Sequence, residues 1–327
     1  MTLLDVAGLR TEFATPTRAV AAVDGLSFQL RPGEILGLVG ESGSGKTVAC
    51  RSLLRLLPSR RARIAAGTVM FENRDLMRLS EAEMRVVRGR DIAMIFQNPA
   101  SHLDPVFTVG DLIAEPLIWH FGESRRAARK RAVELLRQVG IPDPAGQIER
   151  YPHQFSGGMK QRVMIAAALA CEPKILLADE PTTALDVTVQ AQILRLLLDL
   201  RDRTGLAIVL VTHDIGVVAE TCDSVVVLYS GRVMECGGTQ DVLTRPRHPY
   251  TRGLLDSLPT TAARGAELPS ISGYPPPLDR LPQGCRFHPR CRFAIDRCRR
   301  EPIELETVDD GHASACVRWR EVMEVGP

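Results

Sequence analysis

The stretch that decides the fold is Ile35-Leu36-Gly37-Leu38-Val39, which runs into Gly40-Glu41-Ser42-Gly43-Ser44-Gly45-Lys46-Thr47. A short apolar run, a glycine-rich turn and helical spacing from Val48 to Leu57 predict a strand, a loop and a helix. The loop follows the pattern G-x-x-x-x-G-K-[ST], which binds phosphates in this strand–helix context. Its glycines would aim backbone N–H groups inward at the positive end of the helix. Lys46 would contact the outer phosphates and the Thr47 hydroxyl would ligate Mg²⁺, so the sequence predicts nucleotide binding.

Composition bounds the class of protein. The chain has 327 residues, of which 45% are hydrophobic and 24% charged, as in a globular chain of two or three domains. The net charge of +2 gives no general argument for a nucleic-acid partner. The longest apolar run, 163–171, is far below the roughly 18 residues that span a bilayer. No signal peptide is visible, so we expect a cytosolic chain.

The segments around the loop suggest a small sheet and a helical region. Leu3 to Phe13 and Ala22 to Leu30 alternate apolar and polar residues, which predicts an antiparallel sheet. Phe13 is either an adenine-stacking residue or one more half-buried strand residue. The helical pattern from Val109 to Gly140 carries an arginine-rich face, which is typical of a solvated helix surface rather than of a nucleic-acid patch.

Three apolar strands end in polar residues, namely Gln97, the pair Asp179-Glu180, and His213. The carboxyl ends of strands in α/β sheets present functional groups, and phosphoryl transfer needs charge neutralisation and a positioned water. Asp179 would hold Mg²⁺ and Glu180 would polarise the attacking water. His213 would contact the γ-phosphate, and Gln97 would sense both metal and water. Taken singly, His213 can also be a capping residue and Gln97 a turn residue.

A second small-residue turn, Ser156-Gly157-Gly158, opens an apolar helix. It resembles half of a phosphate site, with a hydroxyl, two glycines and a helix N-terminus but no lysine of its own. This suggests that it serves a nucleotide bound to another subunit. The alternative is a plain N-cap by Ser156, which leaves both glycines unexplained.

Six motifs follow one another along the chain in an order that resembles the ATP-binding-cassette ATPase family. They are the phosphate loop, the loop at Gln97, the Ser156-Gly157-Gly158 turn, the strand end Asp179-Glu180, Ala184-Leu185-Asp186, and His213. The resemblance covers residues 1 to about 240. It implies an α/β fold: a P-loop (RecA-like) ATPase core with an N-terminal antiparallel β subdomain and an inserted α-helical subdomain at about 98–160. It also implies that two cassettes sandwich two ATP molecules head to tail, and that Gln97 to Pro105 engages coupling helices of membrane subunits.

Further motifs narrow the resemblance to the dipeptide/oligopeptide permease ATPases. They are Phe96-Gln97-Asn98-Pro99, Leu103-Asp104-Pro105, Ala184 to Gln190, His248-Pro249-Tyr250-Thr251 and Gly284 to Cys291. The resemblance implies an ATPase subunit of a peptide importer, peripheral on the cytoplasmic face of the inner membrane. Its partners would be a second cassette in a heterodimer, two transmembrane permease subunits and an extracytoplasmic substrate-binding protein. His102 departs from the small polar residue that is usual there, which bears on partner specificity.

The tail, residues 241–327, reads as an irregular extension with four cysteines, Cys285, Cys291, Cys298 and Cys316, spaced C-x5-C-x6-C-x17-C. Four thiolates suit zinc or an iron–sulfur cluster, and the short C-x2-C spacing of zinc knuckles is missing. The resemblance implies a 4Fe–4S cluster, with Zn²⁺ as the alternative and disulfides less favoured in the cytosol. We expect a structural role in a module with few hydrophobic residues.

Other functions fit the sequence less well. An importer ATPase for another cargo, such as nickel or an oligosaccharide, remains an alternative. A soluble cassette acting in DNA repair or translation usually carries long coiled-coil insertions or two cassettes in one chain, and neither is present. A non-hydrolysing regulatory cassette conflicts with the presence of Glu180 and His213.

Overall fold

The computed structural model describes residues 2–16, 18–183, 185–258 and 270–324, and the expected motif residue Ala184 lies outside them. The chain forms two compact units. One contains residues 31–34 and 78–211, and the other contains residues 2–30, 35–77 and the chain from 212 onward. The expected boundary near residue 240 stays a prediction. Within the described residues, no helix has the length and apolar character needed to cross a bilayer.

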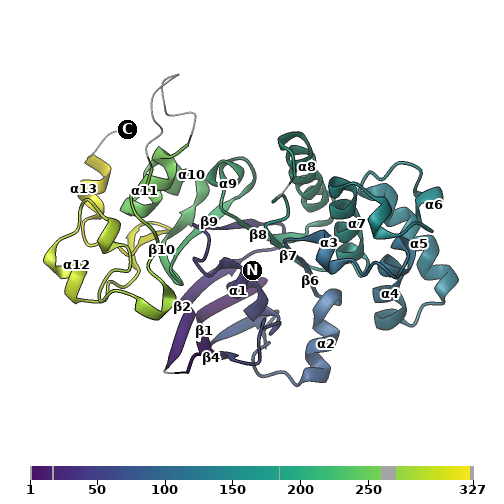
Figure 1. The fold of residues 1–327 in the computed structure, drawn as a ribbon, viewed down its shortest axis with the longest axis horizontal. Coiled ribbons are helices and arrows are strands. Elements are labelled where there is room, and N and C mark those ends of the chain that lie inside the picture. The colour runs from purple at the N-terminus through teal and green to yellow at the C-terminus, as the bar shows by residue number, and fades with distance from the viewer. Residues whose placement is uncertain (1, 17, 184, 259–269, 325–327) are drawn as a thin grey trace. The chain divides into compact units, whose positions relative to one another are not determined.

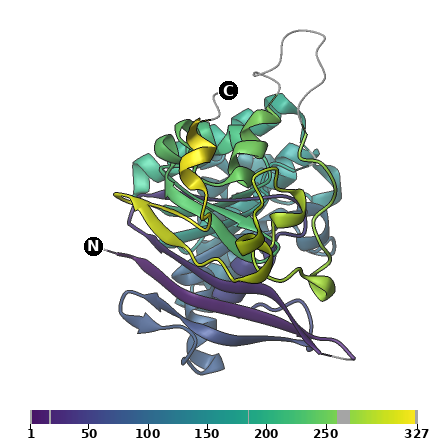
Figure 2. The same cartoon turned by 90° about the vertical axis from the view of Figure 1, so that its left-hand side faces the viewer.

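An antiparallel sheet in the order β2-β1-β4-β5 belongs to the second unit (Figure 2, purple to blue). Its strands are β1 (Leu4–Ala14), β2 (Ala19–Leu30), β4 (Ala62–Phe71) and β5 (Arg74–Asp75). Leu4 pairs with Leu30 on one side and with Phe71 on the other, and all three side chains are buried. This confirms the predicted N-terminal antiparallel β subdomain, whose core face follows from period-two alternation.

The second unit also contains a run of strands in the order β11-β12-β10-β9-β3. β3 (Ile35–Val39) is parallel to β9 (Ser224–Tyr229), which turns into β10 (Arg232–Gly238). The turn residues Ser230 and Gly231 have φ of 45° and 86°, as a two-residue hairpin requires. The tail then adds β12 (His312–Ser314) and β11 (Glu306–Asp309) to the free edge of β10, which the sequence analysis did not predict.

Short helices accompany these strands: α1 (Lys46–Leu53), α9 (Ile215–Thr221), α10 (Thr239–Thr244), α11 (Pro249–Asp256), α12 (Asp296–Arg300) and α13 (Trp319–Glu324). The tail also contains 3₁₀ turns at Leu278–Arg280 and His288–Arg290. The described part of the extension is thus mostly loops and single helical turns, as its proline content and weak periodicity predict.

The first unit contains three parallel strands, β6 (Ile92–Ile95), β7 (Ile175–Asp179) and β8 (Ala207–Thr212), and every residue of β7 and β8 is buried. Its helices are α2 (Glu81–Arg90), α3 (Pro99–His102), α4 (Val109–Phe121), α5 (Arg125–Gln138), α6 (Pro144–Gln147), α7 (Gly157–Leu169) and α8 (Val187–Thr204), most of them teal in Figure 1. The predicted helical stretch is two helices, because Gly122 ends α4 at φ 66° and Ser124 caps α5.

The carboxylate of Asp24 on β2, whose side chain is 9% exposed, links the tail to the N-terminal sheet within the second unit. It accepts hydrogen bonds from Arg10 at 2.6 Å, from Arg232 at 3.0 Å and from Arg286 of the extension. Burial alone would raise the pKa of Asp24, but the hydrogen bond from Arg232 and the charges of these arginines outweigh burial and lower it. Its contribution to stability is therefore complete above the ordinary pKa of 3.8 and is lost as the pH falls through the lower folded value.

We expect Asp24→Asn to lower the free energy of unfolding by about 3–5 kcal/mol, because it leaves the buried guanidinium of Arg286 without its counter-charge. Denaturant unfolding at neutral pH measures this loss. Asp296→Asn is the matched control, since the Asp296–Arg300 pair is 78% and 77% exposed and such pairs contribute about 0–1 kcal/mol. Equal effects of the two substitutions would contradict the assignment.

Candidate active site

The phosphate loop has the backbone that its glycines predict. Gly40, Gly43 and Gly45 have φ of 155°, 76° and 102°, and Gly45 immediately precedes α1. A Cβ at Gly40 would lie 2.1 Å from the carbonyl oxygen of Leu228, and a Cβ at Gly45 would lie 2.4 Å from that of Ala22. The loop is therefore packed against β9 and β2 so closely that only glycine fits at both positions.

Lys46 lies folded back over its own loop. Its Nζ donates hydrogen bonds to the carbonyl oxygens of Gly40 at 2.7 Å and Glu41 at 2.9 Å, and to Ser44 Oγ at 3.4 Å. Only 4% of Lys46 is exposed. The ammonium group thus lies against the backbone of the phosphate loop, where a phosphate oxygen can replace the carbonyls as its partner.

The first unit brings two predicted residues, Gln97 and Glu180, into contact. Gln97 Nε2 donates a hydrogen bond to Glu180 Oε2 at 2.9 Å, and Thr183 Oγ1 donates to the same oxygen at 2.8 Å. Glu180 has φ 46° and its N–H donates to the carbonyl of Val211 on β8. Asp179, the last residue of β7, is fully buried. A carboxylate with fixed backbone and fixed partners is suited to orienting a water molecule.

His213 lies in the turn between β8 and α9, and its side chain is exposed. The turn is fixed by a hydrogen bond from the N–H of Asp214 to Thr212 Oγ1 at 3.0 Å, and Asp214 in turn caps α9. The capping residue here is Asp214 rather than His213. His213 thus lies directly after a strand end, and its expected contact with the γ-phosphate stays a prediction.

Ser156 is the N-cap of α7, and its side chain accepts a hydrogen bond from the N–H of Met159 at 3.4 Å. The two glycines have different explanations. A Cβ at Gly158 would lie 2.6 Å from Cγ1 of Val189 on α8, so packing alone requires glycine there. A Cβ at Gly157 would meet only Leu185 at an ordinary 3.6 Å, and both Ser156 and Gly157 are exposed. Packing therefore accounts for one glycine and leaves the other unexplained.

The segment expected to meet other subunits contains α3 and the turn after it. His102 stacks on Phe96 with ring centroids 4.3 Å apart, and its Nδ1 lies 2.8 Å from the carbonyl oxygen of Asn98. Val106 and Phe107, directly after this segment, are 70% and 50% exposed. Large apolar side chains exposed side by side are typical of a protein–protein contact surface.

The four tail cysteines line one cavity together with Phe287 and Phe293. Burial raises the pKa of Cys291 to about 11 and that of Cys316 to about 12, and the charges of neighbouring thiolates add to both shifts. These thiols are therefore protonated at neutral pH unless a metal displaces the protons. Within the described ranges, no group of three or more His, Cys, Asp or Glu side chains is placed to hold a metal ion.

Sequence reasoning missed three residues that hold the site. Thr183 supports Glu180, as described above. Tyr250 and Arg290, both in the tail, contact Glu41 of the phosphate loop at 2.7 Å and 2.6 Å. In the sequence, the motif His248-Pro249-Tyr250-Thr251 and the stretch that contains Arg290 were noted as marks of resemblance. Arg290 was also one of several arginines expected to offset the charge of the cysteine thiolates. Nothing in their spacing indicates a contact with a loop more than 200 residues earlier.

The fold and this phosphate loop define a nucleotide-binding ATPase, and comparisons identify its relatives. Residues 23–183 match the ABC transporter family model, and residues 234–298 match the model of the oligopeptide/dipeptide transporter C-terminal region. The ATP-binding cassette MJ0796, in a dimeric post-hydrolysis state bound to ADP and Pi, superposes with a TM-score of 0.65 at 29% identity, covering 72% of this chain and 98% of that one.

Full-length relatives are more similar. The protein of Sinorhizobium fredii named as a probable peptide ABC transporter ATP-binding protein is 51% identical over 99% of this chain and 97% of its own length. The dipeptide transport ATP-binding protein DppD of Escherichia coli is 47% identical over 97% of this chain and 96% of its own length. The chain belongs to the ABC transporter family and is one of its ATP-hydrolysing, ATP-binding proteins.

Proposed function

We propose that this chain powers the import of di- and oligopeptides by binding and hydrolysing ATP. The C-terminal extension is what supports a peptide cargo. Residues 234–298 match the oligopeptide/dipeptide transporter C-terminal region, and the relatives that share the whole length are named for peptide or dipeptide transport. Nickel or oligosaccharide import is the alternative cargo, and a soluble non-transport cassette is a weaker one.

Uptake tests the cargo directly. Cells that lack the gene should take up a labelled dipeptide more slowly, and the wild-type gene should restore uptake while a Lys46→Ala gene should not. Normal dipeptide uptake together with impaired uptake of Ni²⁺ or of an oligosaccharide would reject the peptide assignment. Unchanged uptake of all three would reject transport.

The residues of the site are assigned roles on chemical grounds. Thr47, Asp179 and Gln97 supply hydroxyl, carboxylate and amide oxygens, the donors that Mg²⁺ prefers, and we assign them to the ion. When bound, Mg²⁺ neutralises charge on the transferred phosphoryl group. The N–H groups of residues 40–47 and Lys46 bind the phosphates, and Phe13, half-buried on β1, stacks on the adenine. Glu180 withdraws a proton from the attacking water, Gln97 holds its carboxylate, and His213 contacts the γ-phosphate.

Two exposed surfaces of the chain suggest its partner subunits. Ser156 and Gly157 form an exposed helix N-terminus without a lysine, which suits the phosphates of a second cassette. The second cassette is proposed to be a related but distinct chain. The exposed Val106 and Phe107, next to Gln97–Pro105, suit an apolar coupling helix of a membrane permease subunit. Two cassettes would then engage two permease subunits, one each. The chain would then be peripheral on the cytoplasmic face of the inner membrane and work with an extracytoplasmic substrate-binding protein.

Cys285, Cys291, Cys298 and Cys316 are proposed to hold a 4Fe–4S cluster. Four cysteine thiols at one cavity are the donor set of such a cluster. Zn²⁺ is the alternative for the same four thiols. Its role is structural, as a cross-link among loops.

The proposed cluster can be tested by the colour of the purified protein. Protein purified without oxygen should be brown and contain iron, and Cys291→Ser should lose the visible absorbance, because a thiolate ligand is removed. Cys171→Ser is the control, since Cys171 is a buried cysteine of the first unit that does not line the cavity. Colourless protein with stoichiometric zinc would reject the cluster in favour of zinc.

A further inference from the structure

The second residue of the phosphate loop, Glu41, is held by the C-terminal extension. Arg290 Nη1 lies 2.6 Å from Glu41 Oε2 and Arg290 Nη2 lies 3.0 Å from Glu41 Oε1, a two-point pairing of guanidinium and carboxylate. The backbone N–H of Glu41 donates a hydrogen bond to the Tyr250 hydroxyl at 2.7 Å. Both the side chain and the backbone of one loop residue are therefore fixed by residues that lie beyond 248 in the chain.

Burial makes this pairing strong. The Arg290 side chain is 5% exposed and that of Glu41 is 26% exposed. The guanidinium lies over the rings of Tyr229 and Phe287, with its central carbon 5.7 Å and 5.9 Å from their centroids. Burial alone would lower the pKa of Arg290, but its hydrogen bonds to Glu41 and Tyr229 outweigh burial and raise it. The Arg290 guanidinium is therefore charged at every physiological pH, and its burial leaves its pairing with Glu41 little screened by salt.

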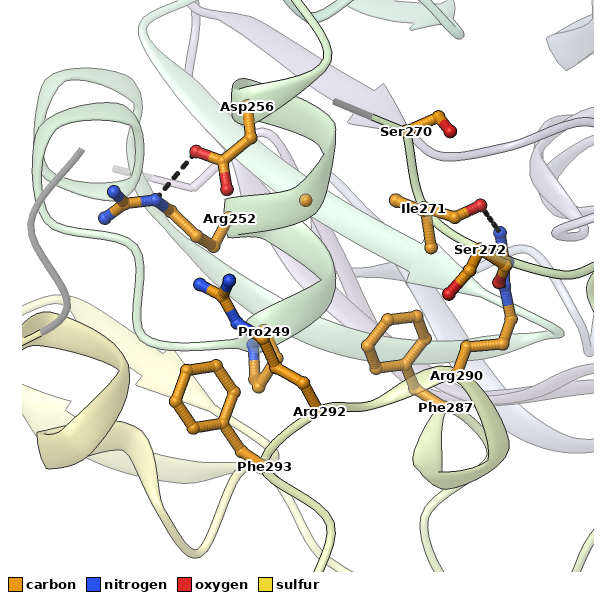
Figure 3. Close-up of a pocket in the computed structure, with 11 residues that line it drawn as sticks. Pro249, Arg252, Asp256, Ser270, Ile271, Ser272, Phe287, Arg290, Arg292 and Phe293 are labelled. Atoms are coloured by element: carbon orange, nitrogen blue, oxygen red, sulfur yellow. Dashed lines mark hydrogen bonds and ion pairs between the residues drawn. The ribbon is translucent and has the colours of Figure 1, made fainter. Parts of the chain in front are cut away.

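Arg290 itself is fixed from the other side. Its Nε donates to the carbonyl oxygen of Ser272 at 2.9 Å, and its Nη2 donates to that of Ile271 at 3.2 Å. Figure 3 shows the side chain directed toward these two residues, beside the ring of Phe287. A guanidinium with this many partners has one orientation, and it transmits the position of the tail backbone to Glu41.

The tail segment that contains Arg290 also lines the cysteine cavity, through His288 and Cys291. Arg290 ends the 3₁₀ turn His288–Arg290, and the next residue, Cys291, lines the cavity with the other three cysteines. On the loop side, the Glu41 carbonyl is one of the two that hold Lys46 Nζ. A continuous series of contacts therefore runs from the cysteines through Arg290 and Glu41 to the lysine of the phosphate loop.

We infer that Arg290 is a positioning residue for nucleotide binding: it holds Glu41, and with it the first half of the phosphate loop, in the conformation that receives the phosphates. The inference rests on the proposed binding of ATP at this loop. A loop that is ordered before the ligand arrives does not lose that conformational freedom on binding, so its affinity is higher.

The test is the equilibrium affinity of the full-length chain for Mg·ATP. We expect Arg290→Met to raise Kd about tenfold, as loss of a charge-assisted pair does, and Arg290→Lys to raise it less. Glu41→Gln should raise Kd by a similar factor. The double variant Arg290→Met/Glu41→Gln should be little worse than either single one, because both substitutions break the same link. Arg297→Met, which removes an exposed partner of Glu301, is the control and should leave Kd unchanged.

Each outcome is decisive. Wild-type affinity in a folded Arg290→Met chain, or multiplied effects in the double variant, would overturn the inference. If Arg290→Met does not fold, the Arg290→Lys chain decides, because it keeps the charge and loses the two-point geometry; wild-type affinity there also overturns it. Failure of the proposed function is a separate result. In that case the wild-type chain and Lys46→Ala would both fail to bind Mg·ATP.

Discussion

Glu180→Gln is expected to keep ATP binding and to slow hydrolysis by about 10²–10⁴-fold, the usual cost of removing a general base. Glu180 follows the buried Asp179, and its carboxylate is fixed by Gln97 and Thr183 at 2.9 Å and 2.8 Å. Glutamine has the same shape and can still accept these two hydrogen bonds, but its amide cannot take a proton from water. The measurements are the ATPase rate of the assembled complex and the affinity of the variant for Mg·ATP.

A matched control lies on the same unit. Glu172 follows α7, and its side chain is 84% exposed with a weak pairing to Arg131 at 3.3 Å. Glu172→Gln makes the same chemical change, so it should leave both hydrolysis and binding unchanged. Hydrolysis at the wild-type rate in Glu180→Gln would show that Glu180 is not the base. Loss of ATP binding in that variant would instead assign Glu180 to the binding of the nucleotide.

Local features of the fold could be predicted because each depends on a few neighbouring residues. Gly40 and Gly45 predict the phosphate loop since only glycine adopts their backbone angles beside another chain segment. Ser230-Gly231 predicts the β9–β10 hairpin for the same reason. Ser80 and Glu83 form a complete capping box, a local sequence pattern that predicts the start of α2.

Pairings between distant segments could not be predicted from local patterns. Strand β12 is three residues long and pairs with β10 through Cys236 and Ala313, which lie far apart in sequence. Three residues are too few for a period-two pattern to be recognised. The approach of Gly158 to Val189 is similar, because it depends on how α7 packs on α8 rather than on either sequence alone. One glycine of the Ser-Gly-Gly turn thus has a packing explanation that the sequence concealed.

The same distinction between local patterns and distant contacts applies to the residues of the candidate site. Motif order was enough to select Gln97 and Glu180, and the structure brings these two into hydrogen-bonding contact. The pairing of Arg290 with Glu41 could not be predicted, because Arg290 is one of several arginines near the cysteines and nothing in the sequence distinguishes it from the others. Its position before Cys291 suggested charge compensation for thiolates, whereas the guanidinium pairs with the phosphate loop.

Ser156→Arg is expected to leave the affinity of the isolated subunit for Mg·ATP nearly intact and to lower turnover of the assembled complex by more than about 100-fold. The first result follows if Ser156 and Gly157, exposed at the start of α7, serve the nucleotide of a partner cassette. The second follows because a bulky side chain would displace the γ-phosphate from the donors that stabilise its transition state, which typically costs 10²–10³-fold.

Ser124→Arg separates this effect from the loss of a helix cap. Ser124 caps α5 as Ser156 caps α7, with side chains that accept from backbone N–H groups at 3.3 Å and 3.4 Å, and both serines are exposed. Each substitution should cost about 1 kcal/mol of stability, so a fall in turnover specific to Ser156→Arg reflects the site rather than the cap. If the isolated subunit loses ATP affinity with Ser156→Arg but not with Ser124→Arg, this turn contacts the nucleotide of its own chain. The head-to-tail arrangement would then not hold.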